Sequence, residues 1–148
     1  MEHHELIEFI RAREHAILAT TRMDGRPQMS PVVAGVDDDG RIVISTYAAR
    51  DKAQNVRRHP NVSVCFLSDD FNGAWVQVDG QAELVEGEDG VEALVDYYRV
   101  LRGDHPDWDE YRAKMREGNK ALIRVTPERS SPVSQGGPYE PKGTGWQP

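Results

Sequence analysis

The stretch YAARDKAQNVRRHP (47–60) concentrates basic side chains in a chain whose formal net charge is −7. Residues 50–58 hold four Arg or Lys and one acidic residue, so the rest of the chain carries −10. Such an acidic chain is a poor candidate for binding a nucleic-acid backbone over a broad face. A single basic segment is better suited to a small anionic ligand, and we expect no nucleic-acid partner.

Residues 51–59 are predicted to form a short helix. Asp51 followed by Gln54 is typical of a capping pair that opens a helix. Pro60 disfavours helical geometry in the residue before it, so the helix is expected to end by about residue 59. The basic side chains are therefore expected at both ends of one short helix.

Arg50 and Lys52 flank the predicted helix start, where unpaired backbone N–H groups already carry a partial positive charge. A cation at this end costs roughly 0.3–1 kcal/mol unless an anion joins it. This pair therefore favours an anion-binding site. A basic run is also typical of a solvated helix face, and Arg57 and Arg58 suit the opposite, C-terminal end without any ligand.

Other residue types that do chemistry form no recognisable site. Cys65 is the one cysteine, which excludes an intrachain disulfide and a multi-cysteine metal site. It lies in the apolar run VSVCFL and is expected to be a buried thiol. The five histidines lack metal-ligand spacing, and no Ser/His/Asp or Cys/His nucleophile pattern is visible. We predict no metal and leave the catalytic residues unknown.

The rest of the chain supplies the elements that position the basic segment. Alternating and apolar runs predict strands, and an Asp-Gly turn joins the first two. Apolar residues at helical spacing predict further helices. The expected strands are 15–22, 28–37, 41–46, 61–67, 73–85 and 120–127, and the expected helices are about 3–13, 51–59, 88–102 and 108–117.

Six strands in hairpin order with helices between them predict a mainly β fold with helices (α+β), built on an antiparallel barrel-like sheet. Pro31 cannot donate a ladder hydrogen bond, so it is expected at a sheet edge or bulge, and Gly80 marks a possible second bulge. We expect one domain, 1–127, followed by an irregular Gly/Pro-rich tail, 128–148.

The chain is expected to be cytoplasmic. No apolar run approaches the roughly 18 residues that a membrane-spanning helix needs. The N-terminal stretch MEHHELIEFI begins acidic and lacks a signal-peptide pattern. We therefore expect no membrane partner.

Three stretches together resemble a known family: LATTRMDGRPQMSPVV (18–33), IVISTYAARDKAQNVRRHPNVSVCFL (42–67) and GAWVQVDGQAEL (73–84). They are similar to the FMN-binding split β-barrel flavoproteins typified by pyridoxamine 5'-phosphate oxidase. Within that superfamily, the branch that uses the deazaflavin coenzyme F420 looks most similar. The resemblance extends into YYRVLRGDHPDWDEYRAKM (97–115), covers about residues 5–126, and implies a six-stranded antiparallel split β-barrel.

This resemblance implies an F420-dependent oxidoreductase that transfers a hydride between the cofactor and an unsaturated small organic substrate. It also implies a homodimer with cofactor sites at the interface and a cofactor phosphate held at the start of the short basic helix. The residues at the family's cofactor positions are Ser30, Pro31 and Val32 for the ring, Ser45, Thr46, Arg50 and Lys52 for the phosphate, Asn55, Arg57 and Arg58 for the negative tail, and Trp75 for closing the ring slot from the partner subunit.

Two alternatives stay open. One is an FMN-dependent oxidase or reductase of the pyridoxamine 5'-phosphate oxidase type. Against that oxidase activity, the C-terminal segment lacks the Arg/His-containing signature with which those oxidases bind the substrate phosphate. The other is a non-catalytic module that binds the cofactor or another planar ligand such as haem, although no residue stands out as an axial ligand. Trp75 is also typical of a core or interface anchor.

Overall fold

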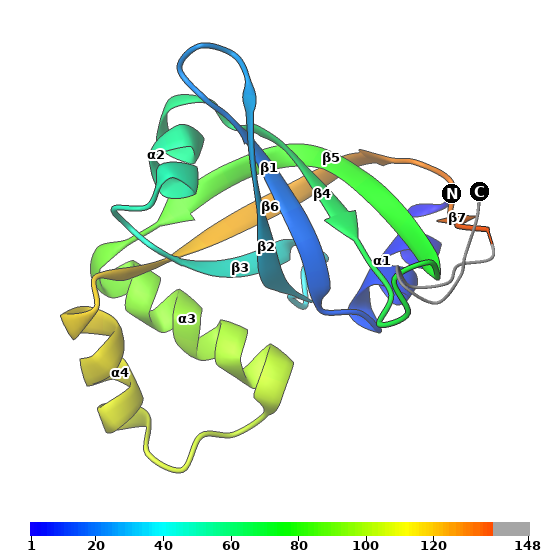
Figure 1. Ribbon diagram of the computed structural model, residues 1–148. Coiled ribbons are helices and arrows are strands. Elements are labelled where there is room, and N and C mark those ends of the chain that lie inside the picture. Colours follow the sequence, from blue (N-terminus) through cyan, green and yellow to red (C-terminus); the bar gives the residue numbers. More distant parts are fainter. Residues whose placement is uncertain (138–148) are drawn as a thin grey trace, which may run out of the picture.

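Six antiparallel strands close into a barrel in the computed structural model, which describes residues 1–137 (Figure 1). The strand order around the barrel is β4-β1-β2-β3-β6-β5, and pairing of β4 with β5 closes it. The predicted α+β fold class, a six-stranded antiparallel split barrel with helices, is confirmed. None of the described helices is long and apolar enough to cross a lipid bilayer.

The elements follow the sequence-based bounds closely. The strands are β1 (His15–Thr21), β2 (Pro27–Val36), β3 (Ile42–Tyr47), β4 (Asn61–Phe66), β5 (Ala74–Val85), β6 (Lys120–Ser130) and β7 (Ser134–Gln135). The helices are α1 (His3–Arg11), α2 (Asp51–Arg58), α3 (Gly87–Arg102) and α4 (Trp108–Glu117).

The C-terminal end of β6 differs most from the prediction. β6 continues to Ser130, so the domain boundary predicted at residue 127 falls inside a strand. β7 then pairs with the start of β5. Residues 138–148 of the predicted tail lie outside the described residues, and the division into a domain and a tail stays a prediction.

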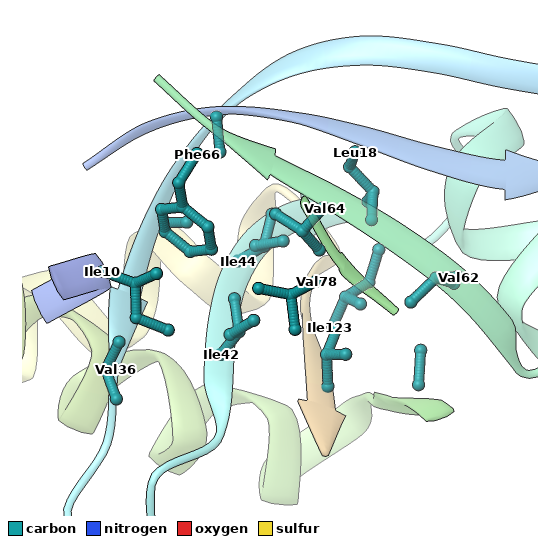
Figure 2. Close-up of a cluster of buried hydrophobic side chains, with 14 of the residues drawn as sticks. Ile10, Leu18, Val36, Ile42, Ile44, Val62, Val64, Phe66, Val78 and Ile123 are labelled. Atoms are coloured by element: carbon teal, nitrogen blue, oxygen red, sulfur yellow. The ribbon is translucent and has the colours of Figure 1, made fainter. Parts of the chain in front are cut away.

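The barrel interior forms the larger hydrophobic core. Alternate residues of each strand point inward, because successive side chains of a strand lie on opposite faces. Ile42 and Ile44 of β3 and Val64 and Phe66 of β4 are fully buried there. Figure 2 shows these side chains together, with Ile10 of α1 in the same cluster.

A second core lies outside the barrel, where α3 and α4 pack over β3 and β6 (Figure 1). Leu94 and Val95 of α3 meet Val43 of β3 and Leu122 of β6, the residues that point away from the barrel interior. Gly35 of β2 allows α3 to lie close, since a Cβ at this position would sit 3.0 Å from a Val100 methyl. The two cores hold β3 firmly between them.

Two irregularities predicted from single residues are confirmed. β2 pairs with β1 along residues 27–33 but with β3 only at residues 34–36, so Pro31 occupies a sheet edge. The register of β5 against β6 shifts between Asp79 and Gly80. A Cβ at Gly80 would collide with the carbonyl oxygen of Thr126, which explains the glycine at this bulge.

Candidate functional site

A cleft of about 470 Å³ lies where β2 and β3 separate. It is bounded by the unpaired half of β2, the end of β3, the start of α2 and the start of β6. Its lining residues are Gln28, Ser30, Ser45, Thr46, Tyr47, Ala49, Arg50, Asp51, Lys52 and Lys120. Five of the residues predicted to bind the cofactor therefore meet here: Ser30, Ser45, Thr46, Arg50 and Lys52.

The start of α2 differs from the prediction in one respect. Its N-cap is Arg50, with extended dihedral angles (φ −68°, ψ 153°) and no side-chain cap. The predicted Asp51–Gln54 capping pair is wrong, because the turn closed by the Arg50 N–H and the Tyr47 carbonyl places Asp51 one residue inside the helix. Gln54 instead donates to the carbonyl of Ala48 at 3.3 Å. No side chain of the described residues therefore caps the first N–H groups of α2.

Lys52 joins the helix start to the unpaired half of β2. Its Nζ donates to Ser30 Oγ at 3.1 Å, and the side chain is half-buried. Burial lowers the pKa of Lys52, and repulsion from Arg50 and Lys120 lowers it further. Nearby positive charges and loss of water both disfavour the charged ammonium, so an anion in the cleft would stabilise it.

Within the part of the chain that the structure describes, the three cations of the cleft have no carboxylate partner. Among residues 1–137, no ion pair joins Arg50, Lys52 or Lys120 to an acidic side chain, whereas most other arginines of the protein are paired. Among the described residues, the one carboxylate that lines the cleft is the exposed Asp51. The cleft thus carries an excess of two positive charges at neutral pH, in a chain that is acidic overall.

Lys120 is a cleft residue that sequence reasoning missed. The antiparallel register of β3 and β6 sets it directly opposite Tyr47. Its Nζ lies 4.4 Å from the centre of the Tyr47 ring, and the Arg50 guanidinium carbon lies 5.1 Å from the same centre. A lysine that opens a strand gives no sequence signal of a ligand, because the strand pairing that places it cannot be read from spacing.

Thr46, which lines the cleft, also carries a buried hydroxyl. The residue is 4% exposed, and its Oγ1 has no hydrogen-bond partner among the described residues. Buried polar atoms of native proteins nearly always have a partner. Together with the uncapped helix start and the three cations, this hydroxyl indicates that the cleft is built to receive a polar, negatively charged group.

Tyr97 of α3 lies where β2 and β3 part. Its hydroxyl donates to the carbonyl oxygen of Val33 at 2.8 Å. Burial raises the pKa of Tyr97, while hydrogen bonds from the side chain and backbone of Ser45 lower it. One hydroxyl therefore connects the last residue of the separated half of β2 with a cleft residue of β3.

The structure places Asn55 and Arg58 away from the cleft, on the contact between α2 and β1. Asn55 is 5% exposed, and its Nδ2 donates to Thr20 Oγ1 at 3.1 Å. Its Oδ1 accepts from the Arg58 guanidinium at 2.6 Å, and Arg58 also donates to the carbonyl of Thr21 at 3.3 Å. These two side chains hold α2 on the barrel.

Arg57 pairs with Glu86 ahead of α3. Two guanidinium nitrogens donate to the two carboxylate oxygens, at 3.1 and 2.7 Å. These hydrogen bonds raise the pKa of Arg57 and lower the pKa of Glu86. The positive charge of Arg57 is therefore matched within the protein.

The remaining predicted residues lie outside the cleft of their own chain. Val32 packs against the barrel core, and Pro31 is exposed on the outer face of β2. Trp75 is the second residue of β5 and lies opposite Ser134 of β7. Cys65, expected to be buried, is half-buried, and burial raises its thiol pKa.

A larger hollow of about 710 Å³ lies over the outer faces of β1, β4 and β5. Its charged groups are already satisfied. Asp79 accepts from Arg129 at 2.7 Å, from Ser63 at 2.6 Å and from Gln77 at 3.0 Å. This hollow therefore lacks the unpaired charge that distinguishes the cleft at α2.

Known proteins share the sequence pattern and the fold. A family model described as pyridoxamine 5'-phosphate oxidase matches residues 3–134. A conserved hypothetical protein from Mycobacterium tuberculosis is 26% identical, with a TM-score of 0.72 over 98% of this chain and 94% of that chain. A structure titled F420 reductase is 23% identical, with a TM-score of 0.63 over 84% of this chain and 94% of that chain. A proposed pyridoxamine 5'-phosphate oxidase from Listeria innocua is 17% identical, with a TM-score of 0.62 over 87% and 95% of the two chains.

Proposed function

The chain belongs to the pyridoxamine 5'-phosphate oxidase family, and from this premise we propose that it is an oxidoreductase that transfers a hydride between coenzyme F420 and an unsaturated small organic substrate. The observation that carries the proposal is the cleft at the start of α2, whose three cations have no acidic partner among residues 1–137 and which lies beside the buried Thr46 hydroxyl. The likeness to a structure titled F420 reductase supports the choice of cofactor.

The residues present fit a cofactor phosphate. Lys52 and Arg50 would bind its oxygens, each charge-assisted hydrogen bond being worth roughly 1.5–3 kcal/mol. Ser30 Oγ accepts from Lys52, so its own hydrogen is free to be donated to the anion. The uncapped N–H groups of α2 and the Thr46 hydroxyl add further donors.

The separated half of β2 fits the edge of a planar ring. Between residues 27 and 33, backbone groups on the side away from β1 have no strand partner among the described residues. Two of their carbonyls accept from side chains, Val33 from Tyr97 and Met29 from Gln28 Nε2 at 3.4 Å. Such groups hydrogen-bond a heterocyclic ring edge and fix its orientation. When bound, the deazaflavin supplies a ring carbon that exchanges a hydride. The chain's own contribution is to bind and orient, and no acid or base is assigned to it.

We propose further that two copies pair through the outer face of β2. Pro27, Met29, Pro31 and Val33 share this face, and Met29 and Val33 are 64% and 37% exposed. A second copy that covers the face would bury this apolar stripe beside the cleft. Trp75 of the partner subunit would then be placed to close the ring slot.

The dimer is tested by sedimentation equilibrium. We expect twice the chain mass of 16.7 kDa for the native protein and a shift toward monomer for Met29→Lys. Ala113→Lys, at an exposed position of α4 away from β2, is a control with the same change of net charge. A native protein that sediments as a monomer at working concentrations would refute this part of the proposal.

FMN is the alternative cofactor, and membership of the pyridoxamine 5'-phosphate oxidase family is the reason to test it. Fluorescence titration of the purified protein with F420 and, separately, with FMN decides between them. We expect micromolar or tighter binding of F420 and much weaker binding of FMN, whereas the reverse order would establish the alternative. Turnover of reduced F420 with enones, quinones or tetrapyrroles then distinguishes an enzyme from a module that only binds the cofactor.

A further inference from the structure

We propose that the Lys120 side of the cleft is a second anion position, next to the phosphate position at Lys52 and Ser30. The cleft would then take a ligand with two neighbouring anionic groups rather than a lone phosphate. The inference rests on the proposed function only in placing the first anion at Lys52. It adds a binding residue from β6 that the basic segment of the sequence does not contain.

The charge balance supports a second anion. Arg50, Lys52 and Lys120 all line the cleft, and one carboxylate, the exposed Asp51, faces them. A single monoanion at Lys52 would leave part of this positive charge uncompensated. Both side chains line the same cleft, and the charge of Lys120 lowers the pKa of Lys52, so two neighbouring anionic groups would stabilise both ammonium groups.

The position of Lys120 is fixed by backbone contacts rather than by an ion pair. Its neighbour Asn119 adopts a positive φ of 49°, and the Ala48 N–H donates to the Asn119 carbonyl at 3.0 Å. Pairing with Tyr47 then sets the residue in register at the first position of β6. The ammonium lies against the Tyr47 ring, where it keeps its hydrogen-bond donors for a ligand.

The cations farther along α2 are less suited to the second anionic group. Arg57 is held by Glu86, and Arg58 by Asn55 and Thr21. An anion at Arg57 or Arg58 would have to displace these partners. At Lys120 it would displace no carboxylate among the described residues. A ligand that extends from Lys52 past the Tyr47 ring toward β6 therefore reaches Lys120, whose charge has no carboxylate partner among the described residues.

Calorimetric titration with inorganic phosphate and with pyrophosphate tests the second position directly. We expect the native protein to bind pyrophosphate more tightly than phosphate. Lys120→Ala should lower pyrophosphate affinity about tenfold or more, as expected for loss of one charge-assisted hydrogen bond, and leave phosphate affinity within about twofold. Lys120→Arg should restore the affinity for pyrophosphate. Lys52→Ala should lower the affinity for both phosphate and pyrophosphate.

Lys114→Ala is the matched control, because Lys114 lies on α4 and pairs with Glu110 outside the cleft. It removes the same charge and should leave both affinities unchanged. Equal losses in Lys114→Ala and Lys120→Ala would show a net-charge effect and overturn the proposal, as would unaltered pyrophosphate binding in Lys120→Ala. Failure of the proposed function would look different: pyrophosphate would bind as described while F420 would not bind.

Discussion

Lys52 Nζ lies 3.1 Å from Ser30 Oγ, which joins the first turn of α2 to the one stretch of β2 that has lost its neighbour on the β3 side. The contact spans 22 residues of sequence and closes the cleft across the split in the barrel. It places a half-buried ammonium and a hydroxyl side by side, with two more cations nearby. This pair is the centre of the proposed anion site.

Replacing Lys52 should weaken cofactor binding more than it weakens the fold. We expect Lys52→Ala to reduce F420 affinity by about 1–3 kcal/mol, because a charge-assisted hydrogen bond to the phosphate is lost. The unfolding free energy should change little, since removal of Lys52 relieves repulsion with Arg50 and Lys120. Fluorescence titration at low ionic strength measures the affinity, with Lys114→Ala as the control. An undiminished affinity would count heavily against the site.

Arg57 should behave in the opposite way. Its side chain and that of Glu86 are 34% and 46% exposed, so Arg57→Ala should cost only about 0.2–1 kcal/mol of stability, as is usual for exposed pairs. F420 affinity should stay within about twofold of native, because the lost charge was already matched by Glu86. Urea unfolding and the same titration measure both quantities. A tenfold loss of F420 affinity would show instead that Arg57 reaches the cofactor.

The contrast between Lys52 and Arg57 illustrates how far sequence reasoning extends. Strands and helices were predictable because their periodicities differ, and Pro60 marked the end of α2, whose C-cap is His59. The proposal of an anion site also followed from cations at a helix start. Which basic residue is held by an ion pair did not follow, because Glu86 lies 29 residues from its partner Arg57.

Two other features depended on strand register and turn geometry. Lys120 enters the cleft only because β6 pairs with β3 so that it faces Tyr47. Tyr97 reaches the split because α3 packs over β2 at Gly35. The cap of α2 was misassigned because Asp51 is a common N-cap residue, and the preceding turn, which moves the cap to Arg50, has no such composition signal.

Tyr97→Phe should loosen the split between β2 and β3. The variant keeps the ring and loses the hydroxyl that donates to Val33, so we expect a loss of about 0.5–1.5 kcal/mol in unfolding free energy. Amide exchange in β2 residues near Val33 should also become faster. Tyr98→Phe is the control, because Tyr98 contributes ring packing against Trp108 and Tyr111, which Phe retains. Equal effects of the two variants would argue against a specific role for the Tyr97 hydroxyl.

Asp79 should make stability depend on pH in the acid range. Hydrogen bonds from Ser63, Arg129 and Gln77 lower the pKa of Asp79 from 3.8 to about 2. Because the folded-state pKa lies below the unfolded one, the contribution is fully present above about pH 3.8 and is lost as pH falls toward 2. Denaturant unfolding should show a shallower decline over this range for Asp79→Asn than for the native protein. Parallel declines would contradict the assignment.

The position of the cofactor phosphate in a crystal grown with saturating F420 tests the central claim most directly. We predict that its oxygens lie within ion-pair distance of Lys52 Nζ and the Arg50 guanidinium, at the uncapped start of α2. A phosphate found elsewhere, with Lys52 and Arg50 surrounded by water, would contradict the proposed site and the function built on it.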